Sequence, residues 1–275
     1  MTVISAVINR RCIAVASDSL ITYEEGNTRI VLERKKPKIV KVESKKAILS
    51  YWGYAATTAK MRGWTTYDFL KKIAKDAYQF ESLKLFADYI KEQLNKDVGV
   101  KLKYDKKGIG IHLIGYTEVK GEYIPEFYLI SNFRITNKSY QNEPQLRVSS
   151  ELYKTLPKSY RKWLHPTNEN KVNAIKTFLN EGKMFIFNNG DPFMFNPVFN
   201  GYQKSYRIAK ERGILDNNEI ERARFLAREP IVCVVNAQKV LFREGSKIVG
   251  GRVHDIILKK DTFNYHSSSK SAKIE

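Results

Sequence analysis

Three residues near the start of the chain carry groups that could cooperate in attack on a carbonyl carbon: Thr2, Asp18 and Lys38. Methionine aminopeptidases remove Met1 when the second residue is small, so the mature chain is expected to begin at Thr2. The hydroxyl and a free α-amine would then belong to one residue. An α-amine has a pKa of about 7.7 to 8.0, so its neutral form can accept the hydroxyl proton during attack. Threonine is also common at this position without any chemical role.

Asp18 follows a run of small and apolar residues, CIAVAS, that is typical of a strand. It is in phase with Ala14 and Ala16, whose small side chains leave space for another group beside the carboxylate. The carboxylate is therefore a candidate partner for a cation. The alternative is an acid that serves only a turn or a cap.

The two lysines of the segment KIVKV, at 38–42, lie on opposite faces of a predicted strand. Lys38 shares a face with the two valines, whereas Lys41 shares a face with Ile39. One of these lysines is expected to point into the interior, where an acid must compensate its charge. The alternative is an exposed basic edge strand of the kind that deters aggregation.

The elements that would position these residues follow from the periodicity of apolar side chains. A polar turn at 9–11 joins the first two predicted strands into an antiparallel hairpin. Strands are predicted at 2–8, 12–16, 28–32, 38–42, 46–51, 108–117, 125–131, 184–187, 231–236, 239–242 and 253–258. Helices are predicted at about 65–77, 82–94, 172–181, 194–212 and 216–230, where Pro230 ends the last of them. No element is assigned over about 140–170.

This order of strands, helix pair, strands, helices and strands indicates an α+β protein in which helices cover the outer faces of antiparallel sheets. With 275 residues, the chain is long enough for one large domain or two small ones. Only Cys12 and Cys233 are present, so a disulfide framework is not expected and a reducing compartment is. The four histidines have no ligand spacing, so no metal site is expected.

The charge is high: 48 Lys and Arg against 29 Asp and Glu give +19. Such a charge predicts attraction to polyanions or to acidic partners. No apolar stretch approaches the roughly 20 residues that span a bilayer, and the N-terminus shows no cleavage-site pattern. A soluble cytoplasmic protein is therefore expected.

The opening segment TVISAVINRRCIAVASDSLIT resembles the start of proteasome β-subunits and their bacterial peptidase relatives, which are N-terminal nucleophile hydrolases. The resemblance places Thr2 at the family's nucleophile, Asp18 at its acid and Thr22 at the threonine near the substrate groove. KPKIVKV resembles the lysine strand, which places Lys38 at the catalytic lysine. AILSYWGYAA resembles the junction that supplies the oxyanion hole, with the backbone N–H near Ser50 as donor.

Later segments also resemble this family, and the sequence departs from it at several positions. GIGIHLIGYTEVKGEYIPEFYLIS resembles the central hairpin, and IVGGRVHDIILKKD resembles the last strands. The family usually has Gly where Ser50 falls, and its auxiliary Asp and Ser do not appear at Ser246 and Val249. A Gly-Ser-Gly stretch is missing, and Asp191 is a candidate auxiliary residue in its place.

The resemblance implies a four-layer αββα sandwich as one domain over 1–262, followed by a disordered tail over 263–275. It implies a threonine peptidase or amidohydrolase that forms an acyl-enzyme on peptide bonds and needs neither metal nor cofactor. It also implies assembly into a homo-oligomer or ring, and an ATP-dependent unfoldase as partner.

Two other functions are considered. One is a proteasome-like subunit without activity that serves assembly or binding. The other is a nucleic-acid-binding protein, suggested by the charge and by the basic clusters at 34–36 and 45–46. No nucleic-acid-binding module accompanies these clusters, which flank predicted strands as solvated charges do, so nucleic acid is the least favoured partner.

Overall fold

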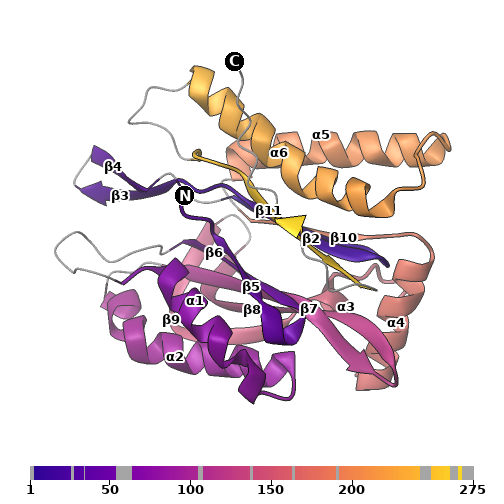
Figure 1. Cartoon of the computed structure of the whole chain (residues 1–275), viewed down its shortest axis with the longest axis horizontal. Helices are drawn as coiled ribbons and strands as arrows, with labels where there is room; N and C mark the ends of the chain where they lie inside the picture. Colours follow the sequence, from indigo (N-terminus) through magenta and orange to yellow (C-terminus); the bar gives the residue numbers. More distant parts are fainter. Residues whose placement is uncertain are drawn as a thin grey trace. The chain divides into compact units, whose positions relative to one another are not determined.

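The computed structural model describes residues 3–25, 28–33, 35–53, 64–104, 108–136, 139–162, 165–189, 192–241, 249–260 and 266–267. The chain divides into two compact units (Figure 1). The first unit comprises Met1–Ile39, Thr58–Arg62 and Ile186–Glu275, and the second comprises Val40–Thr57 and Gly63–Phe185. The single domain predicted over 1–262 stays a prediction.

The first unit is built on a five-stranded sheet in the order β10, β1, β2, β11, β12. Its strands are β10 (Phe185–Asn189), β1 (Ile4–Ile8), β2 (Cys12–Ser17), β11 (His254–Lys259) and β12 (His266–Ser267). The predicted hairpin of β1 and β2 is confirmed, with an antiparallel register that runs from Ile4 opposite Ser17 to Ile8 opposite Ile13. Every residue of these two strands is buried. β3 (Ile21–Glu25) and β4 (Thr28–Glu33) form a separate two-stranded ribbon.

The long helix α6 (Glu219–Leu241) packs against β1, β2 and β11, and α5 (Pro192–Glu211) packs against α6 (Figure 1). The predicted end of this helix at Pro230 and the strands predicted at 231–236 and from 239 are wrong, because the helix continues through them. The β-branched run favours a strand locally, but its apolar residues lie on one buried helical face, and burial overrides propensity. The buried residues of α6 are Ala223, Leu226, Ala227, Pro230, Ile231, Val234, Val235 and Gln238.

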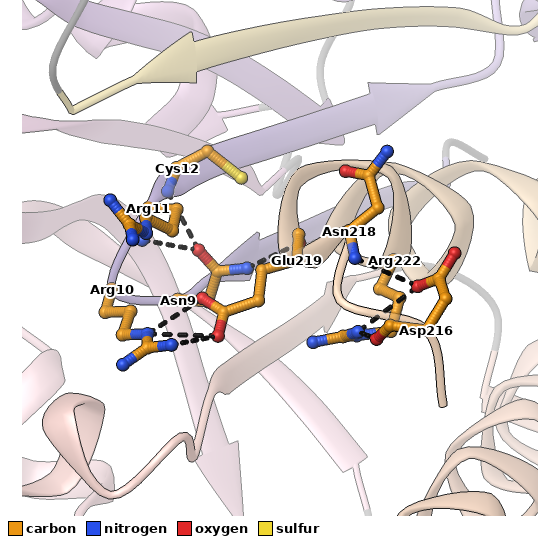
Figure 2. A network of polar contacts seen from close by, with 8 residues as sticks. All are labelled: Asn9, Arg10, Arg11, Cys12, Asp216, Asn218, Glu219 and Arg222. Carbon is orange, nitrogen blue, oxygen red and sulfur yellow. Dashed lines mark hydrogen bonds and ion pairs between the residues drawn. The ribbon is translucent and has the colours of Figure 1, made fainter. Parts of the chain in front are cut away.

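The turn between β1 and β2 holds the first turn of α6 (Figure 2). The Asn9 side-chain amide donates to the Glu219 carbonyl at 2.8 Å, and its Oδ1 accepts from the backbone N–H groups of Arg11 and Cys12, both at 2.8 Å. Arg10 makes a bidentate pair with the Glu219 carboxylate, with Nε 2.9 Å from Oε2 and Nη2 2.6 Å from Oε1. Asn9 is only 5% exposed, so this turn is fixed mainly by a buried amide.

Replacing Asn9 by alanine is expected to lower the free energy of unfolding by about 1–3 kcal/mol, because buried donors and acceptors lose their partners. Arg10→Ala is the matched control. Arg10 is largely exposed, and an exposed ion pair contributes about 0–1 kcal/mol. Urea denaturation of both variants measures the difference. An Arg10→Ala loss larger than the Asn9→Ala loss would contradict this explanation.

The second unit is built on a five-stranded sheet in the order β5, β6, β7, β8, β9. Its strands are β5 (Ile39–Val42), β6 (Ala47–Gly53), β7 (Ile109–Val119), β8 (Glu122–Thr136) and β9 (Ser139–Ser150). The pairs from β6 to β9 are antiparallel. Its helices are α1 (Thr66–Asp76), α2 (Leu83–Tyr104), α3 (Leu152–Thr155) and α4 (Asn168–Asn180). Alternate residues of β6 to β8 pack with α1 and α2 in one apolar core.

On the other face of this sheet, His112 of β7 packs among aromatic rings. Its ring centroid lies 4.5 Å from that of Trp52 and 4.8 Å from that of Phe127. Trp52 itself lies over Gly110, where a Cβ would come within 2.0 Å of the indole. His112 is 1% exposed, and burial lowers its pKa to about 3. The imidazole is therefore neutral in the folded chain over the physiological range.

This burial predicts a loss of stability in acid. The unfolded chain binds a proton at His112 below pH about 6.5, whereas the folded chain does so only near pH 3. The unfolded state is thus favoured progressively as the pH falls through this window. From pH 6.5 to pH 4.5 this residue should remove about 2 kcal/mol of stability. Comparing His112→Phe with the native chain by denaturation at both pH values isolates the effect, and equal acid sensitivity of the two would contradict it.

The predicted α+β class with antiparallel sheets is confirmed. Each unit contains one five-stranded sheet with helices packed on it, which is consistent with a sandwich fold. Among the described helices, none has both the length and the apolar character required to cross a membrane. Of the tail predicted over 263–275, the structure describes only His266–Ser267, which pairs with β11.

Candidate active site

Asp18 lies directly after β2 and is fully buried. Its Oδ1 accepts from Lys38 Nζ at 2.8 Å and from the backbone N–H of Val3 at 3.0 Å. Its Oδ2 accepts from the backbone N–H groups of Leu20 and Gly250, both at 3.3 Å. One lysine and three backbone donors therefore surround the carboxylate and offset the free-energy cost of burying its charge.

Lys38, directly before β5, is the inward-facing lysine of the two that the sequence left open. Its side chain is fully buried and forms an ion pair with Asp18. Lys41, by contrast, keeps 27% of its side chain exposed and pairs with the exposed Glu43. Burial lowers the pKa of Lys38, and the charge and hydrogen bond of Asp18 only partly oppose this effect. A lysine of this kind can stabilise a nearby negative charge or exchange a proton more readily than an exposed one.

The ion pair holds the residue that follows Thr2. Val3 is fully buried, and its backbone groups make two hydrogen bonds with Asp18. The Val3 N–H donates to Oδ1 at 3.0 Å, and the Asp18 N–H donates to the Val3 carbonyl at 3.2 Å. The nitrogen of the peptide bond between Thr2 and Val3 is therefore in direct contact with the carboxylate that binds Lys38. Thr2 itself lies outside the described residues.

Further hydrogen bonds connect the residue after Asp18, and helix α6, to the segment at 249–252. The Ser19 N–H donates to the Gly250 carbonyl at 3.2 Å, and Ser19 Oγ accepts from the Arg252 N–H at 2.8 Å. Buried Gln238 of α6 accepts from the Val249 N–H at 3.0 Å through Oε1. Neither Ser19 nor Gln238 is predicted as a site residue from the sequence. A polar residue on an otherwise apolar helical face is the signal for Gln238, but the sequence predicts strands on both sides of this residue and no helix.

No known protein family matches the sequence, and no curated protein matches it. Among solved structures, the chain is similar to Anbu (ancestral beta-subunit) from Yersinia bercovieri. The two share 11% sequence identity with a TM-score of 0.49, and the alignment covers 98% of this chain and 88% of that chain.

The sequence predicts three further site residues: Ser50, Thr22 and Asp191. Ser50 is buried within β6 of the second unit, opposite His112 of β7. Thr22 lies in β3 of the first unit, opposite Val31. Asp191 lies outside the described residues. Their predicted roles stay predictions. Among the described residues, no three His, Cys, Asp or Glu side chains are placed to hold a metal ion.

Proposed function

We propose that this chain is a proteasome-like threonine peptidase or amidohydrolase, with Thr2 exposed as nucleophile by removal of Met1. The observation that carries the proposal is the buried Lys38–Asp18 pair, whose carboxylate also binds the N–H of the Thr2–Val3 peptide bond. A fixed chain directly after an N-terminal nucleophile helps to orient it, and a cation close to its hydroxyl favours the ionised form. The contacts of Val3, Asp18 and Lys38 are suited to both effects.

A purely structural role explains this pair less well. Replacing a buried ion pair by apolar residues of similar size is often neutral or stabilising, so such a pair is a poor device for stability alone. Strongly perturbed ionisable groups are instead common at catalytic sites. The contact of this pair with the backbone N–H of Val3 therefore favours a chemical role.

The proposed reaction has two stages. Thr2 Oγ attacks the carbonyl carbon of a peptide bond while its α-amine accepts the hydroxyl proton. A backbone N–H near Ser50 is the proposed donor to the oxyanion. The tetrahedral intermediate breaks its C–N bond, the amine product leaves with that proton, and an ester remains on Thr2. Water then cleaves the ester, which releases the acid product and restores the hydroxyl.

The two residues of the ion pair have different functions in this scheme. Lys38 lowers the pKa of the Thr2 hydroxyl through its positive charge, and Asp18 orients Lys38 and balances its charge. Asp191 is a candidate auxiliary residue. No step needs a metal or a cofactor. The proposed substrate is a peptide or protein, and the proposed setting is a cytoplasmic homo-oligomer or ring that works with an ATP-dependent unfoldase.

Hydrolysis of fluorogenic peptide amides by the purified chain tests the proposal. A panel with apolar, basic and acidic residues before the scissile bond covers the unknown specificity. At least one peptide should release its fluorophore, and an epoxyketone should block the release. Absence of hydrolysis across the panel, together with no reaction with the epoxyketone, would contradict the enzyme and favour the alternative of an inactive subunit for assembly or binding.

A further inference from the structure

One face of the first sheet has polar side chains in a single row. Asp255 of β11 pairs with Arg224 of α6 at 2.9 Å, so Asp255 faces that helix. His254 directly precedes Asp255 and lies on the opposite face, because successive residues of a strand point to opposite sides. The rows across β1, β2 and β11 on that face are Ile4–Ser17–His254, Ala6–Val15–Ile256 and Ile8–Ile13–Leu258. Only the first of these three rows is polar, and it lies next to Asp18.

Packing alone does not account for the polar side chains of this row. Ser17 is fully buried, and its Oγ has no hydrogen-bond partner among the described residues. His254 Nε2 is buried as well, and it too bonds to no residue in the described part of the chain. An unpaired buried polar group lowers stability, which an apolar residue would avoid. The imidazole is therefore expected to serve another purpose.

The other ring nitrogen of His254 holds a separate segment of the chain. The side chain makes a hydrogen bond with the backbone of Lys35 that favours the protonated ring, so the ring donates and the carbonyl accepts. Because Nε2 bonds to none of the described residues, the donor is Nδ1. Burial, followed by the charge of Arg252, lowers the pKa of His254. The carboxylates of Asp255 and Asp18 oppose this effect only partly, so the ring is neutral at physiological pH and keeps its proton on Nδ1.

Lys35 belongs to the short segment that carries Lys38. Residues 35–38 are described and form neither helix nor strand, so contacts with other segments must fix their path. Pro37 lies between the two lysines, and its ring fixes one of the few dihedral angles that separate them. The position of Lys35 therefore affects the position of Lys38.

The start of β11 also contacts the chain around Asp18. The Gly250 N–H donates to Asp18 Oδ2 at 3.3 Å, and His254 pairs with Ser17, which directly precedes Asp18. The segment at 250–254 thus contacts both partners' segments: it lies beside Asp18 through its backbone and reaches the residues before Lys38 through the imidazole. All of these residues belong to the first unit.

We propose that His254 is a positioning residue of the proposed active site. Its bond from Nδ1 to the Lys35 carbonyl holds the ammonium of Lys38 against the Asp18 carboxylate. This inference rests on the proposed function, because the position of Lys38 affects the reaction only if Thr2 is the nucleophile. Without the imidazole, Lys38 Nζ should move from its place 2.8 Å from Asp18 Oδ1. Displacing a group that acts on a reacting atom by about 1 Å can lower a rate by about 100-fold.

Epoxyketone labelling of Thr2 tests the proposal in three variants. His254→Leu removes the donor and should slow labelling by about 10–100-fold. His254→Asn places an amide N–H close to the position of Nδ1 and should restore most of the lost rate. Ser17→Ala changes the same row and leaves the bond to Lys35 intact, so it is the matched control and should react like the native chain. Urea denaturation should separate the Leu and Asn variants far less than labelling does.

NMR of the ¹⁵N-labelled chain gives two readouts that need no reaction at Thr2. The imidazole of His254 in the native chain should carry its proton on Nδ1. The ammonium of Lys38 should give a resonance that is identified by its loss in Lys38→Met. This resonance should keep its position in His254→Asn and shift in His254→Leu.

Several results would overturn the proposal. One is a proton on Nε2 of His254 in the native chain, and another is an unchanged Lys38 resonance in His254→Leu. A third is labelling of His254→Asn or Ser17→Ala that is as slow as that of His254→Leu. If the native chain does not react with the epoxyketone while the Lys38 resonance shifts as expected, the proposed function fails and the positioning of Lys38 by His254 stands.

Discussion

Replacing Thr2 by alanine is expected to abolish peptide hydrolysis and labelling by an epoxyketone while leaving the free energy of unfolding unchanged. The substitution removes the hydroxyl but keeps the main chain that Val3 and Asp18 fix. Loss of a nucleophile in enzymes that form acyl intermediates lowers kcat by about 10⁴-fold or more. Fluorogenic peptide turnover and intact-mass measurement of the labelled chain give the two readouts.

Two further variants serve as controls for this result. Thr2→Ser keeps a hydroxyl beside the α-amine and should retain labelling. Thr177→Ala removes an exposed threonine of α4 that is remote in sequence from Thr2, and it should react like the native chain. Labelling of the Thr2→Ala chain at the native rate would show that another residue is the nucleophile.

Removing one member of the buried ion pair is expected to cost about 3–5 kcal/mol, because the other charge is left buried without compensation. Both Lys38 and Asp18 have no exposed side-chain surface, and they lie 2.8 Å apart. Lys38→Met should therefore lower the unfolding free energy by this amount and also prevent labelling of Thr2. Lys41→Met is the matched control, with an expected cost below about 1 kcal/mol since its pair with Glu43 is exposed.

The double replacement of Lys38 by Met and Asp18 by Asn separates structure from chemistry. Without a buried charge, its loss of stability should be smaller than the sum of the two single losses. The double variant should nevertheless lack hydrolysis, because it has no lysine to polarise the Thr2 hydroxyl. Urea denaturation and labelling rates of the four chains complete the cycle. If the double variant recovered both activity and stability, the ion pair would have only a structural role.

The contact between Asp18 and Lys38 could be anticipated in part because both residues adjoin short strands with simple alternation. The first hairpin has a polar turn between two apolar runs, so both strands and their register follow from local pattern. The alternation along 38–42 left open which of the two lysines points inward, and only the packed structure distinguishes Lys38 from Lys41. The link from Asp18 to Gly250 joins residues far apart in sequence, which no local pattern reports.

Where prediction failed, tertiary packing outweighed local preference. The apolar run after Pro230 has strand propensity, yet it is helical because α6 buries it against β1 and β2. β9 was missed because its sequence, SYQNEPQLRVSS, is mostly polar. This strand pairs with β8 at the edge of its sheet. Among those of its residues whose side chains the structure describes, at 145–150, Leu146 and Val148 contact the apolar core.

The central claim is that the mature chain begins at a reactive Thr2. The most direct test is tandem mass spectrometry of the N-terminal peptide after native protein has reacted with an epoxyketone, which requires a hydroxyl and a free α-amine on one residue. Met1 should be absent, and the adduct should lie on Thr2. Retention of Met1, or an adduct on any other residue, would contradict it.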